Sequence, residues 1–212
     1  MSRLVKRLID VATALIGLIA LSLLMAVVAV AIRLTMGPPV LFRQSRIGLH
    51  GRPFDLLKFR TMTESTDETG TLRQDHERLT RLGKFLRKTS LDELPQLWNV
   101  LKGEMSIVGP RPLPVEYLSL YSCDRHRRHQ VPQGIIGWAG VKGRNLNTWD
   151  KKFELDLWYV DNWSLLLDAK IVCMSLFTVL SGAGVSQEGF ATAPKLTADT
   201  HEETDTEGSA HT

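Results

Sequence analysis

The chain has 212 residues, of which 43% are hydrophobic and 23% are charged, and its formal net charge is +3. This length is sufficient for one domain with a buried core, and the composition is that of a globular protein rather than a wholly disordered chain. Its two cysteines, Cys123 and Cys173, lack the spacing of a metal site and exclude a disulfide framework.

The charges are distributed unevenly along the chain. Five acidic residues and no Lys or Arg lie between Asp199 and Thr212, so the rest of the chain carries a net charge of +8. A basic body indicates an anionic partner, such as membrane lipid, a phosphorylated substrate or nucleic acid. The residues from Asp199 onward include no large apolar side chain, and we expect residues 191–212 to form a disordered acidic tail.

Residues 11–32 form an apolar segment of 22 residues without a charge. At about 1.5 Å per residue, a helix of this length is roughly 33 Å long, which is enough for the hydrocarbon core of a bilayer. A cleaved signal peptide is disfavoured, because the apolar run is too long for one and no clear small-x-small cleavage site follows it. We therefore expect residues 1–36 to be embedded in a membrane.

Basic residues flank this segment on both sides and do not select an orientation. Arg3, Lys6 and Arg7 precede it, and Arg33, Arg43 and Arg46 follow it. Equal flanks are expected for a helix that enters and leaves through one leaflet, since a spanning helix normally places its basic end in the cytoplasm. A returning helix needs a break, yet the interior contains no proline and only Thr13 and Ser22 as hydroxyl residues. Crossing and re-entry are therefore both open.

Residues 37–190 are expected to form one soluble domain. The stretches 38–48 and 52–62 predict two strands joined by a Gly turn, which is a small β-hairpin. Apolar residues recur with helical spacing in 78–89, 94–103 and 114–129, and twice in 147–182, with a separation near Asp161-Asn162. The tryptophans and lysines of the first late helix fit either a lipid interface or packing on the domain. The expected class is α+β and mostly helical, with amphipathic interfacial helices.

Asp92 and Glu93 lie side by side near the start of a predicted helix. Ser90 and Glu93 fit a capping box, in which the Glu93 side chain reaches back to the Ser90 amide and Asp92 merely complements the helix dipole. Local sequence favours this structural interpretation, although Pro95 lies beyond the first turn if Ser90 is the N-cap. The alternative is that the carboxylates do chemistry at the mouth of a helix, where oriented N–H groups also favour a phosphate.

Basic residues from several predicted segments accompany these carboxylates. They are Lys58, Arg60, Arg87, Lys88 and Arg111. Because arginine binds phosphate oxygens in a bidentate manner, a divalent metal and a diphosphate would fit between these groups, and an Asp could attack phosphorus there. A surface salt-bridge network is the alternative for any one cation. His126 and His129 have the spacing of a metal pair, but the adjacent arginines favour a solvated basic face.

A long series of motifs resembles the bacterial sugar transferases, the monotopic phosphoglycosyl transferases. The motifs are KRLIDV before the apolar segment, KFRTM, RLGKFLRKTSLDELPQLWNVLKGEMSIVGPRP, VEYL, GRN and WDKKFELD. The resemblance runs from Lys6 to about Gly189, and the central block is too long to arise by chance. The length of the chain resembles the minimal members, which start glycan assembly without additional transmembrane helices.

The resemblance implies that a sugar 1-phosphate moves from a UDP-sugar to undecaprenyl phosphate, with release of UMP, at the cytoplasmic face of the bacterial inner membrane. This would be the first membrane step in the synthesis of an O-antigen, capsule, exopolysaccharide or glycoprotein glycan. It implies that Asp92 carries the phospho-sugar and binds Mg²⁺, and that Glu93 activates or positions the lipid phosphate. The cations on family motifs are expected to contact phosphates: Lys58, Arg60, Arg87 and Arg111. Residues 37–190 would then be the cytosolic catalytic domain, and the family's re-entrant helix would explain the two basic flanks.

Two segments depart from the family pattern. The usual Ser-Pro of the membrane segment is Ser22-Leu23 here, so a break would depend on Ser22 bonding back to the helix. Residues 131–145 differ at Gln133 and Gly140, which affects the nucleotide and sugar contacts expected there. The alternative function is a non-catalytic membrane-anchored module that binds anionic lipid or a partner. Nucleic-acid binding is disfavoured, since the basic residues lack the interleaved aromatics of a stacking platform.

Overall fold

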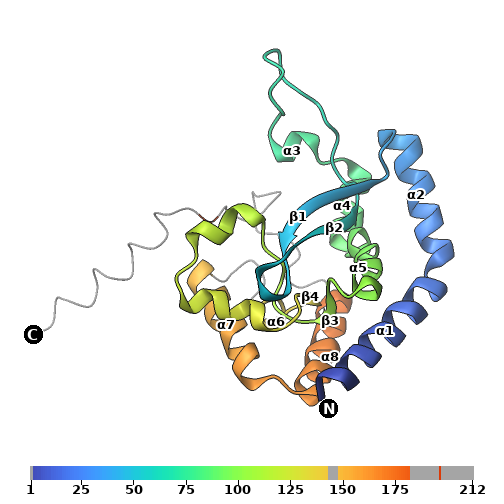
Figure 1. The fold of residues 1–212 in the computed structure, drawn as a ribbon. Coiled ribbons are helices and arrows are strands. Elements are labelled where there is room, and N and C mark those ends of the chain that lie inside the picture. The colour runs from blue at the N-terminus through green and yellow to red at the C-terminus, as the bar shows by residue number, and fades with distance from the viewer. Residues whose placement is uncertain (1, 143–147, 182–195, 197–212) are drawn as a thin grey trace, which may run out of the picture.

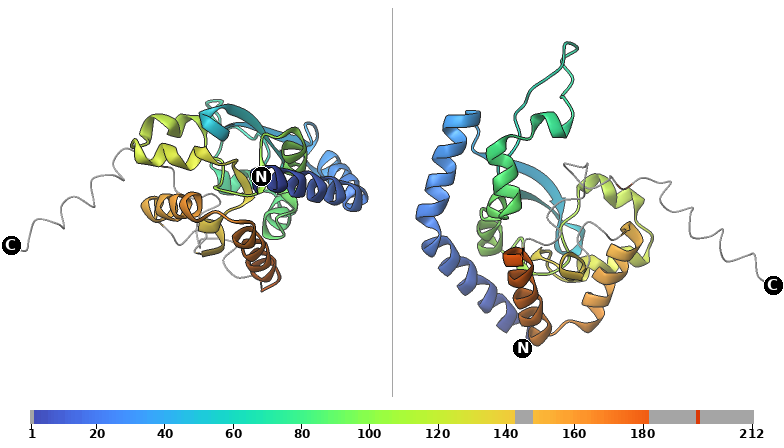
Figure 2. Two further views of the ribbon diagram at one scale, coloured as in Figure 1. Left: turned by 60° about the horizontal axis from the view of Figure 1, so that its bottom comes forward. Right: turned by 180° about the vertical axis from the view of Figure 1, so that it is seen from behind.

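The computed structural model describes residues 2–142, 148–181 and 196. The described chain is mostly helical with two small two-stranded sheets, so the predicted α+β class is confirmed. A bent helix pair runs along one side of the body in Figures 1 and 2. The predicted tail 191–212, apart from Leu196, and the GRN motif at 143–145 lie outside the described residues.

The apolar segment forms two helices, α1 (Ser2–Ala20) and α2 (Ser22–Met36), with a bend of 62° between them. Ser22 Oγ donates a 2.8 Å hydrogen bond to the Ile19 carbonyl, a back-bond of the kind that bends helices. Backbone hydrogen bonds of Leu21 continue the helical ladder through the break. The bend therefore forms at the serine without the proline of the family pattern.

No single helix in the described part of the chain is long and apolar enough to cross a bilayer. Taken together, α1 and α2 are long and apolar enough by length and composition. Large apolar side chains are exposed on both helices, among them Ile16, Ile19, Leu23 and Leu34. A single straight helix over residues 11–32, which a simple span requires, is not formed. The geometry is that of a broken or re-entrant segment.

Lys6 attaches α1 to the body of the protein. Its Nζ donates to the Val108 carbonyl at 3.1 Å and to Asp168 Oδ2 at 2.7 Å, and both charged side chains are buried. Asp168 also accepts hydrogen bonds from Tyr159 Oη at 2.7 Å and from Trp163 Nε1 at 3.2 Å. We call Lys6, Asp168, Tyr159 and Trp163 the anchor cluster. Both of its charges, on Lys6 and Asp168, have a partner.

Two more residues of the KRLID motif extend this attachment. Asp10 Oδ1 accepts the amide hydrogen of Ile107 at 3.0 Å. The Arg7 guanidinium donates to the carbonyls of Val100 and Leu101 at 2.6 and 2.9 Å, near the C-terminal end of a helix, where the helix dipole favours a cation. The motif therefore fixes α1 to the segments 100–101 and 107–108.

The predicted β-hairpin is confirmed and is shorter than expected. Strands β1 (Leu41–Ile47) and β2 (Pro53–Phe59) pair antiparallel, with Leu41 opposite Phe59. The 3₁₀ helix η1 (Leu49–Gly51) forms the tip, where His50 and Gly51 both have positive φ angles of 55° and 76°. Residues after Phe59 leave the strand and project from the body with α3 (Asp75–Arg78), as Figure 1 shows.

Helix α4 (Arg81–Lys88) begins where Thr80 Oγ1 accepts the Gly83 amide hydrogen at 2.9 Å. A Cβ on Gly83 would lie 1.9 Å from the Thr61 carbonyl oxygen, so glycine lets α4 pack directly on the chain that leaves β2. Helix α5 (Gln96–Lys102) ends at Gly103, whose φ of 88° requires the left-handed conformation. Gly83 therefore lets α4 pack on the chain just after the hairpin, and α5 contacts β2 directly.

Helices α4 and α5 lie within the predicted segments 78–89 and 94–103, but Phe85 and Trp98, which share the apolar spacing of those segments, do not face the core. The two helices bury Leu86 and Val100 and leave Phe85 and Trp98 more than half exposed. Leu86 packs in a cluster with Ile32 of α2 and Phe59 of β2. The exposed aromatic side chains suit an interface with lipid, although the placement at an interface stays a prediction.

The middle of the chain corrects two expectations. A second sheet, which the sequence did not indicate, pairs β3 (Ser106–Val108) in parallel with β4 (Gly134–Ile136). The single helix predicted over 114–129 is wrong, because two 3₁₀ helices form instead, η3 (Val115–Leu120) and η4 (Asp124–Gln130). Tyr121 between them is buried with extended backbone angles, which interrupts the helix.

The two late helices are confirmed as α7 (Trp149–Asn162) and α8 (Leu165–Ser181), after the short helix α6 (Trp138–Lys142). Helix α7 buries Phe153 and Tyr159, and its Trp158 stacks on Trp138 with 5.1 Å between ring centroids. This arrangement favours packing on the domain, rather than a lipid interface, for most of α7.

Candidate active site

Asp92 and Glu93 lie in a short 3₁₀ helix, η2 (Leu91–Glu93), between α4 and α5. Ser90 enters this helix in the left-handed conformation, with a φ of 57°, and its side chain forms no cap. The Ser90 amide donates to the Arg87 carbonyl at 3.2 Å. The capping-box interpretation is therefore wrong, because neither of its two reciprocal hydrogen bonds is formed.

Glu93 instead binds two cations from distant segments. Its Oε1 accepts a hydrogen bond from Lys58 Nζ at 2.8 Å and another from Arg111 Nη2. Burial alone would raise the pKa of Glu93, but the charges of Arg111 and Lys58 hold it well below its usual range. Glu93 is therefore ionised at neutral pH and holds two cations together.

Asp92 has a different environment from its neighbour. Its side chain is buried, and no hydrogen bond or ion pair to its carboxylate occurs among the residues that the structure describes. Burial raises the pKa of Asp92, while the positive charge of Lys58 opposes this shift most strongly. The charge of Glu93 adds to the increase, and Arg111 and Arg87 reduce it. A desolvated carboxylate with uncommitted oxygens beside cations is a candidate nucleophile.

Two of the predicted cations reach this site from β2 and α4. Burial lowers the pKa of Lys58, and its ion pair with Glu93 opposes that change. The Arg87 Nε donates to Thr61 Oγ1 at 3.1 Å, which fixes the side chain across the α4 contact. Burial also lowers the pKa of Arg87, against the charge of Asp92. We call Lys58, Arg87, Asp92, Glu93 and Arg111 the dyad cluster.

Arg111 is positioned by a residue that the sequence interpretation missed. The Arg111 carbonyl accepts a 2.8 Å hydrogen bond from Arg128 Nη2, and Arg128 also pairs with Asp156 Oδ2 at 2.6 Å. Arg128 and His129 are buried, so the solvated basic face expected for this segment is wrong at both positions. The sequence signal that could have indicated a buried Arg128 was its partner Asp156, the last residue of the WDKKFELD motif.

Close backbone contacts place the turn that carries Arg111. A Cβ on Gly134 would lie 2.0 Å from the Gly109 nitrogen, so these two backbone segments can approach this closely only with glycine. Gln133, in the segment that departs from the family pattern, is buried and donates to the carbonyls of Arg128 and Val131 at 3.1 Å each. In this structure Gln133 therefore supports the backbone beneath the site.

Arg60 is not brought into the dyad cluster. Its guanidinium donates to the carbonyls of Pro38 at 2.9 Å and Met62 at 3.0 Å, and lies 3.7 Å from Glu64. The side chain is buried in this arrangement. Arg60 thus fastens the chain between α2 and β1 to the chain after β2.

Arg46 is a further cation near the cluster that the sequence did not single out for the site. Its Nη1 donates to the Pro112 carbonyl at 3.4 Å, next to Arg111. Burial, followed by the charge of Arg111, lowers the pKa of Arg46 to about 10. Arg46 therefore adds positive charge on the Arg111 side of the site.

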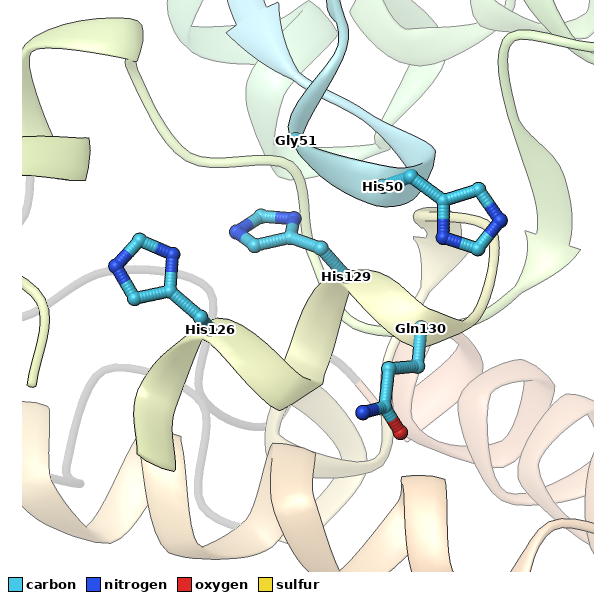
Figure 3. A pocket seen from close by; sticks show the side chains of 5 residues that line it. All are labelled: His50, Gly51, His126, His129 and Gln130. Atoms are coloured by element: carbon cyan, nitrogen blue, oxygen red, sulfur yellow. The ribbon is translucent and has the colours of Figure 1, made fainter. Parts of the chain in front are cut away.

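The histidines that the structure describes do not form a metal site. His126 and His129 line a cavity of about 190 Å³ with His50, Gly51 and Gln130. Figure 3 shows that the His50 ring points away from the other two imidazoles. Within the described part of the chain, no group of three or more His, Cys, Asp or Glu side chains is arranged to hold a metal ion.

Comparisons with known proteins agree with the motifs. The family described as bacterial sugar transferase matches residues 1–182. The uncharacterized sugar transferase EpsL of Bacillus subtilis is 51% identical over 194 residues, which cover 92% of this chain and 96% of that protein.

Two longer relatives have names that state a reaction. The UDP-glucose:undecaprenyl-phosphate glucose-1-phosphate transferase of Klebsiella pneumoniae is 42% identical over 182 residues, which cover 81% of this chain and 39% of that protein. The UDP-N-acetylgalactosamine-undecaprenyl-phosphate N-acetylgalactosaminephosphotransferase of Aeromonas hydrophila is 41% identical over 190 residues, which cover 85% of this chain and 44% of that protein.

The matched regions thus span nearly all of EpsL and about two fifths of the two longer relatives. The family match over residues 1–182 takes in the bent helix pair, the dyad cluster and the segments that support it. The protein belongs to the bacterial sugar transferase family.

Proposed function

We propose that this protein transfers a sugar 1-phosphate from a UDP-sugar to undecaprenyl phosphate and releases UMP. The names of the Klebsiella and Aeromonas relatives support this reaction class. The observation that carries the proposal is the buried Asp92 carboxylate, which has no described partner and lies beside a cluster of cations. Both substrates are anionic, so the charge of the cluster suits them.

In the proposed first step, an Asp92 carboxylate oxygen attacks the β-phosphorus of the UDP-sugar. A new P–O bond forms to Asp92, and the bond from the β-phosphorus to the bridging oxygen breaks. UMP leaves with that electron pair, and the sugar phosphate stays on the enzyme. In the second step a phosphate oxygen of the polyprenyl phosphate attacks the same phosphorus, and Asp92 leaves as a carboxylate.

Glu93 is proposed to position charge rather than to accept a proton. A carboxylate whose pKa is held well below its usual range is a weak base. Because one oxygen of Glu93 binds both Lys58 and Arg111, it fixes their spacing where two phosphoryl groups must be held. Positioning and charge neutralisation are the main requirements of phosphoryl transfer.

Mg²⁺ is the proposed cofactor, and the residues present fit a metal shared with the substrate. Mg²⁺ commonly binds through one or two carboxylates together with substrate phosphates and water. Asp92 offers uncommitted carboxylate oxygens, whereas Glu93 is engaged by two cations. When bound, the metal would neutralise charge on the diphosphate.

The proposed location is the cytoplasmic membrane of a bacterium, with the catalytic domain at its cytoplasmic face. The 62° bend between α1 and α2 and the basic residues at both ends support a helix pair that returns to the same face. UDP-sugars are cytoplasmic metabolites, so a site on that face would meet its donor. Cysteine-accessibility labelling at both ends of residues 2–36 tests this topology.

The experiment that tests the proposed reaction is a donor screen with the purified full-length chain. UDP-glucose, UDP-galactose and UDP-N-acetylgalactosamine are each incubated with Mg²⁺ and undecaprenyl phosphate, and UMP is measured. We expect UMP release with at least one donor, formed together with a polyprenyl-diphosphate sugar. Release of UDP, or no turnover with an extended donor panel while the protein stays folded, would contradict the proposal and favour a non-catalytic module.

A further inference from the structure

A second cavity lies away from the dyad cluster, at the start of α1. Its volume is about 200 Å³, and none of its lining residues belongs to the dyad cluster. Three cations line it from one face of α1, namely Arg3, Lys6 and Arg7, with Asp10 as the lining acid. We call it the α1 cavity.

The α1 cavity has a positive charge that the described residues do not neutralise. Lys6 is paired with Asp168, whereas Arg7 donates only to neutral backbone carbonyls. Arg3 is exposed and has no described ion pair. Counting Asp10 and Asp168 against the three cations leaves a net charge of +1, which matches a singly charged phosphodiester.

Much of the remaining wall of the α1 cavity is apolar. Leu49, Met105, Val131, Pro132 and Trp163 contribute to the lining. A free phosphate or nucleotide would place its hydration shell against these side chains, whereas an amphiphile would not. Tryptophan beside basic residues is also the usual composition of a membrane interface.

An exposed apolar strip begins directly beside this cavity. Leu4 and Leu8 of α1 are 65% and 61% exposed, and they lie on the face adjacent to Arg3 and Arg7. A lipid whose phosphate occupies the cavity can therefore lay its acyl chains along Leu4 and Leu8.

His50 and Gln130 line both the α1 cavity and the neighbouring cavity of Figure 3. These side chains offer hydrogen bonds to the part of a headgroup that lies beyond the phosphate. A headgroup with hydroxyl groups, such as glycerol, suits this arrangement.

From these observations we infer that the α1 cavity binds the headgroup of an anionic phospholipid, with Arg3 and Arg7 on the phosphodiester. The inference rests on the proposed membrane location of α1 and α2, and it does not depend on the proposed reaction. The lipid would hold the start of α1 at the interface, next to the anchor cluster that joins α1 to β3.

Native mass spectrometry tests the inference by counting lipids bound to the full-length protein in neutral detergent during titration. Phosphatidylglycerol should bind more tightly than phosphatidylcholine. Arg3→Gln should weaken phosphatidylglycerol binding roughly tenfold, or about 1.4 kcal/mol. The matched control is Arg33→Gln, which removes an exposed arginine at the far end of the helix pair and should leave binding unchanged. Arg3→Lys should retain most of the affinity.

Three results would overturn the inference. One is equal loss of binding in Arg3→Gln and Arg33→Gln, which indicates general surface electrostatics. Another is competition by millimolar inorganic phosphate, which indicates a soluble ligand. The third is displacement of phosphatidylglycerol by equimolar undecaprenyl phosphate, which indicates a site for the acceptor. UMP release by Arg3→Gln in lipid-free detergent should equal that of the wild type, so failure of the lipid site and failure of the proposed reaction are distinguishable.

Discussion

The anchor cluster and the dyad cluster are both groups of buried charges, and they differ in how completely those charges are paired. In the anchor cluster, Lys6 and Asp168 bind each other at 2.7 Å, and the carboxylate accepts two further hydrogen bonds. In the dyad cluster, Glu93 binds two cations while Asp92 has no described partner. Asp92 and Glu93 are adjacent in one 3₁₀ turn, yet their pKa values shift in opposite directions, because burial dominates at Asp92 and the paired cations dominate at Glu93.

This difference separates structure from chemistry. A fully paired buried network makes its packing specific and leaves no group free to react, since removal of one partner exposes an uncompensated charge. An unpaired buried carboxylate destabilises the fold in its ionised form, and such groups are concentrated at functional sites. We therefore expect mutations in the anchor cluster to affect stability and mutations at Asp92 to affect turnover.

The largest effect is expected for Asp92→Asn. The amide cannot act as the nucleophile, so UMP release should fall by at least about 10³-fold. The melting temperature should stay the same or rise, because burial raises the pKa of Asp92 and the ionised form is disfavoured in the folded protein. A coupled assay and differential scanning fluorimetry measure both quantities. Wild-type turnover in this variant would contradict the role of Asp92.

Lys6→Met is expected to have the opposite profile. It leaves the Asp168 charge buried without its partner, which costs about 3–5 kcal/mol. For a chain of this size the melting temperature should fall by roughly 6–20 °C. The double variant Lys6→Met/Asp168→Asn should recover part of this loss. Unchanged stability of Lys6→Met in a thermal scan would break the comparison between the two clusters.

Arg60 and Arg111 sharpen the comparison among the predicted cations. Arg60→Gln removes charged donors from two backbone carbonyls, so the free energy of unfolding should fall by about 2 kcal/mol. Its turnover per folded molecule should stay within about threefold of the wild type. Arg111→Gln should reduce turnover roughly 10²-fold, because it removes a cation bound to Glu93. Equal losses of turnover in the two variants would place Arg60 at the substrate.

His129 gives a prediction for stability against pH outside both clusters. Burial, followed by the positive charge of Arg128, lowers the pKa of His129 to about 3. The unfolded chain takes up a proton near pH 6.5 and the folded chain does not, so stability falls as the pH decreases from about 6.5 towards 3.

At pH 5 this effect amounts to about 2 kcal/mol. His129→Phe keeps the stacking on Tyr121 and removes the titration. The melting temperature of this variant should fall less than that of the wild type between pH 7.5 and pH 5, by roughly 4–8 °C. An equal fall of the melting temperature in the two proteins between pH 7.5 and pH 5 would contradict the lowered pKa of His129.

Local patterns predicted much of the molecule from sequence. The hairpin, α4, α5 and the two late helices follow from apolar periodicity and turn residues, and those signals lie within each segment. The dyad and all three cations of the dyad cluster follow from the family motifs, whereas the fourth predicted cation, Arg60, lies outside the cluster. The sequence alone did not decide whether the apolar segment bends at Ser22, because a crossing helix and a re-entrant helix need the same apolar composition.

The remaining features depend on contacts between distant segments. Strands β3 and β4 have three residues each, which is too short for a periodic signal, and each exists only through pairing with the other. Arg60 lies on a family motif like Arg111, but the Pro38 carbonyl, 22 residues away, determines its environment. Arg128 is buried because Asp156 neutralises it across 28 residues. Local sequence shows the basic character of such residues and not their partners.

Trapping of the intermediate tests the central claim about Asp92 most directly. The enzyme is incubated with Mg²⁺ and each UDP-sugar without acceptor, quenched, and analysed by intact and peptide mass spectrometry. We predict a sugar-phosphate adduct on the peptide that contains Asp92, one equivalent of UMP per enzyme, and discharge of the adduct by undecaprenyl phosphate. UMP release that requires the acceptor, with no adduct at any time point, or an adduct on a different residue, would contradict the account.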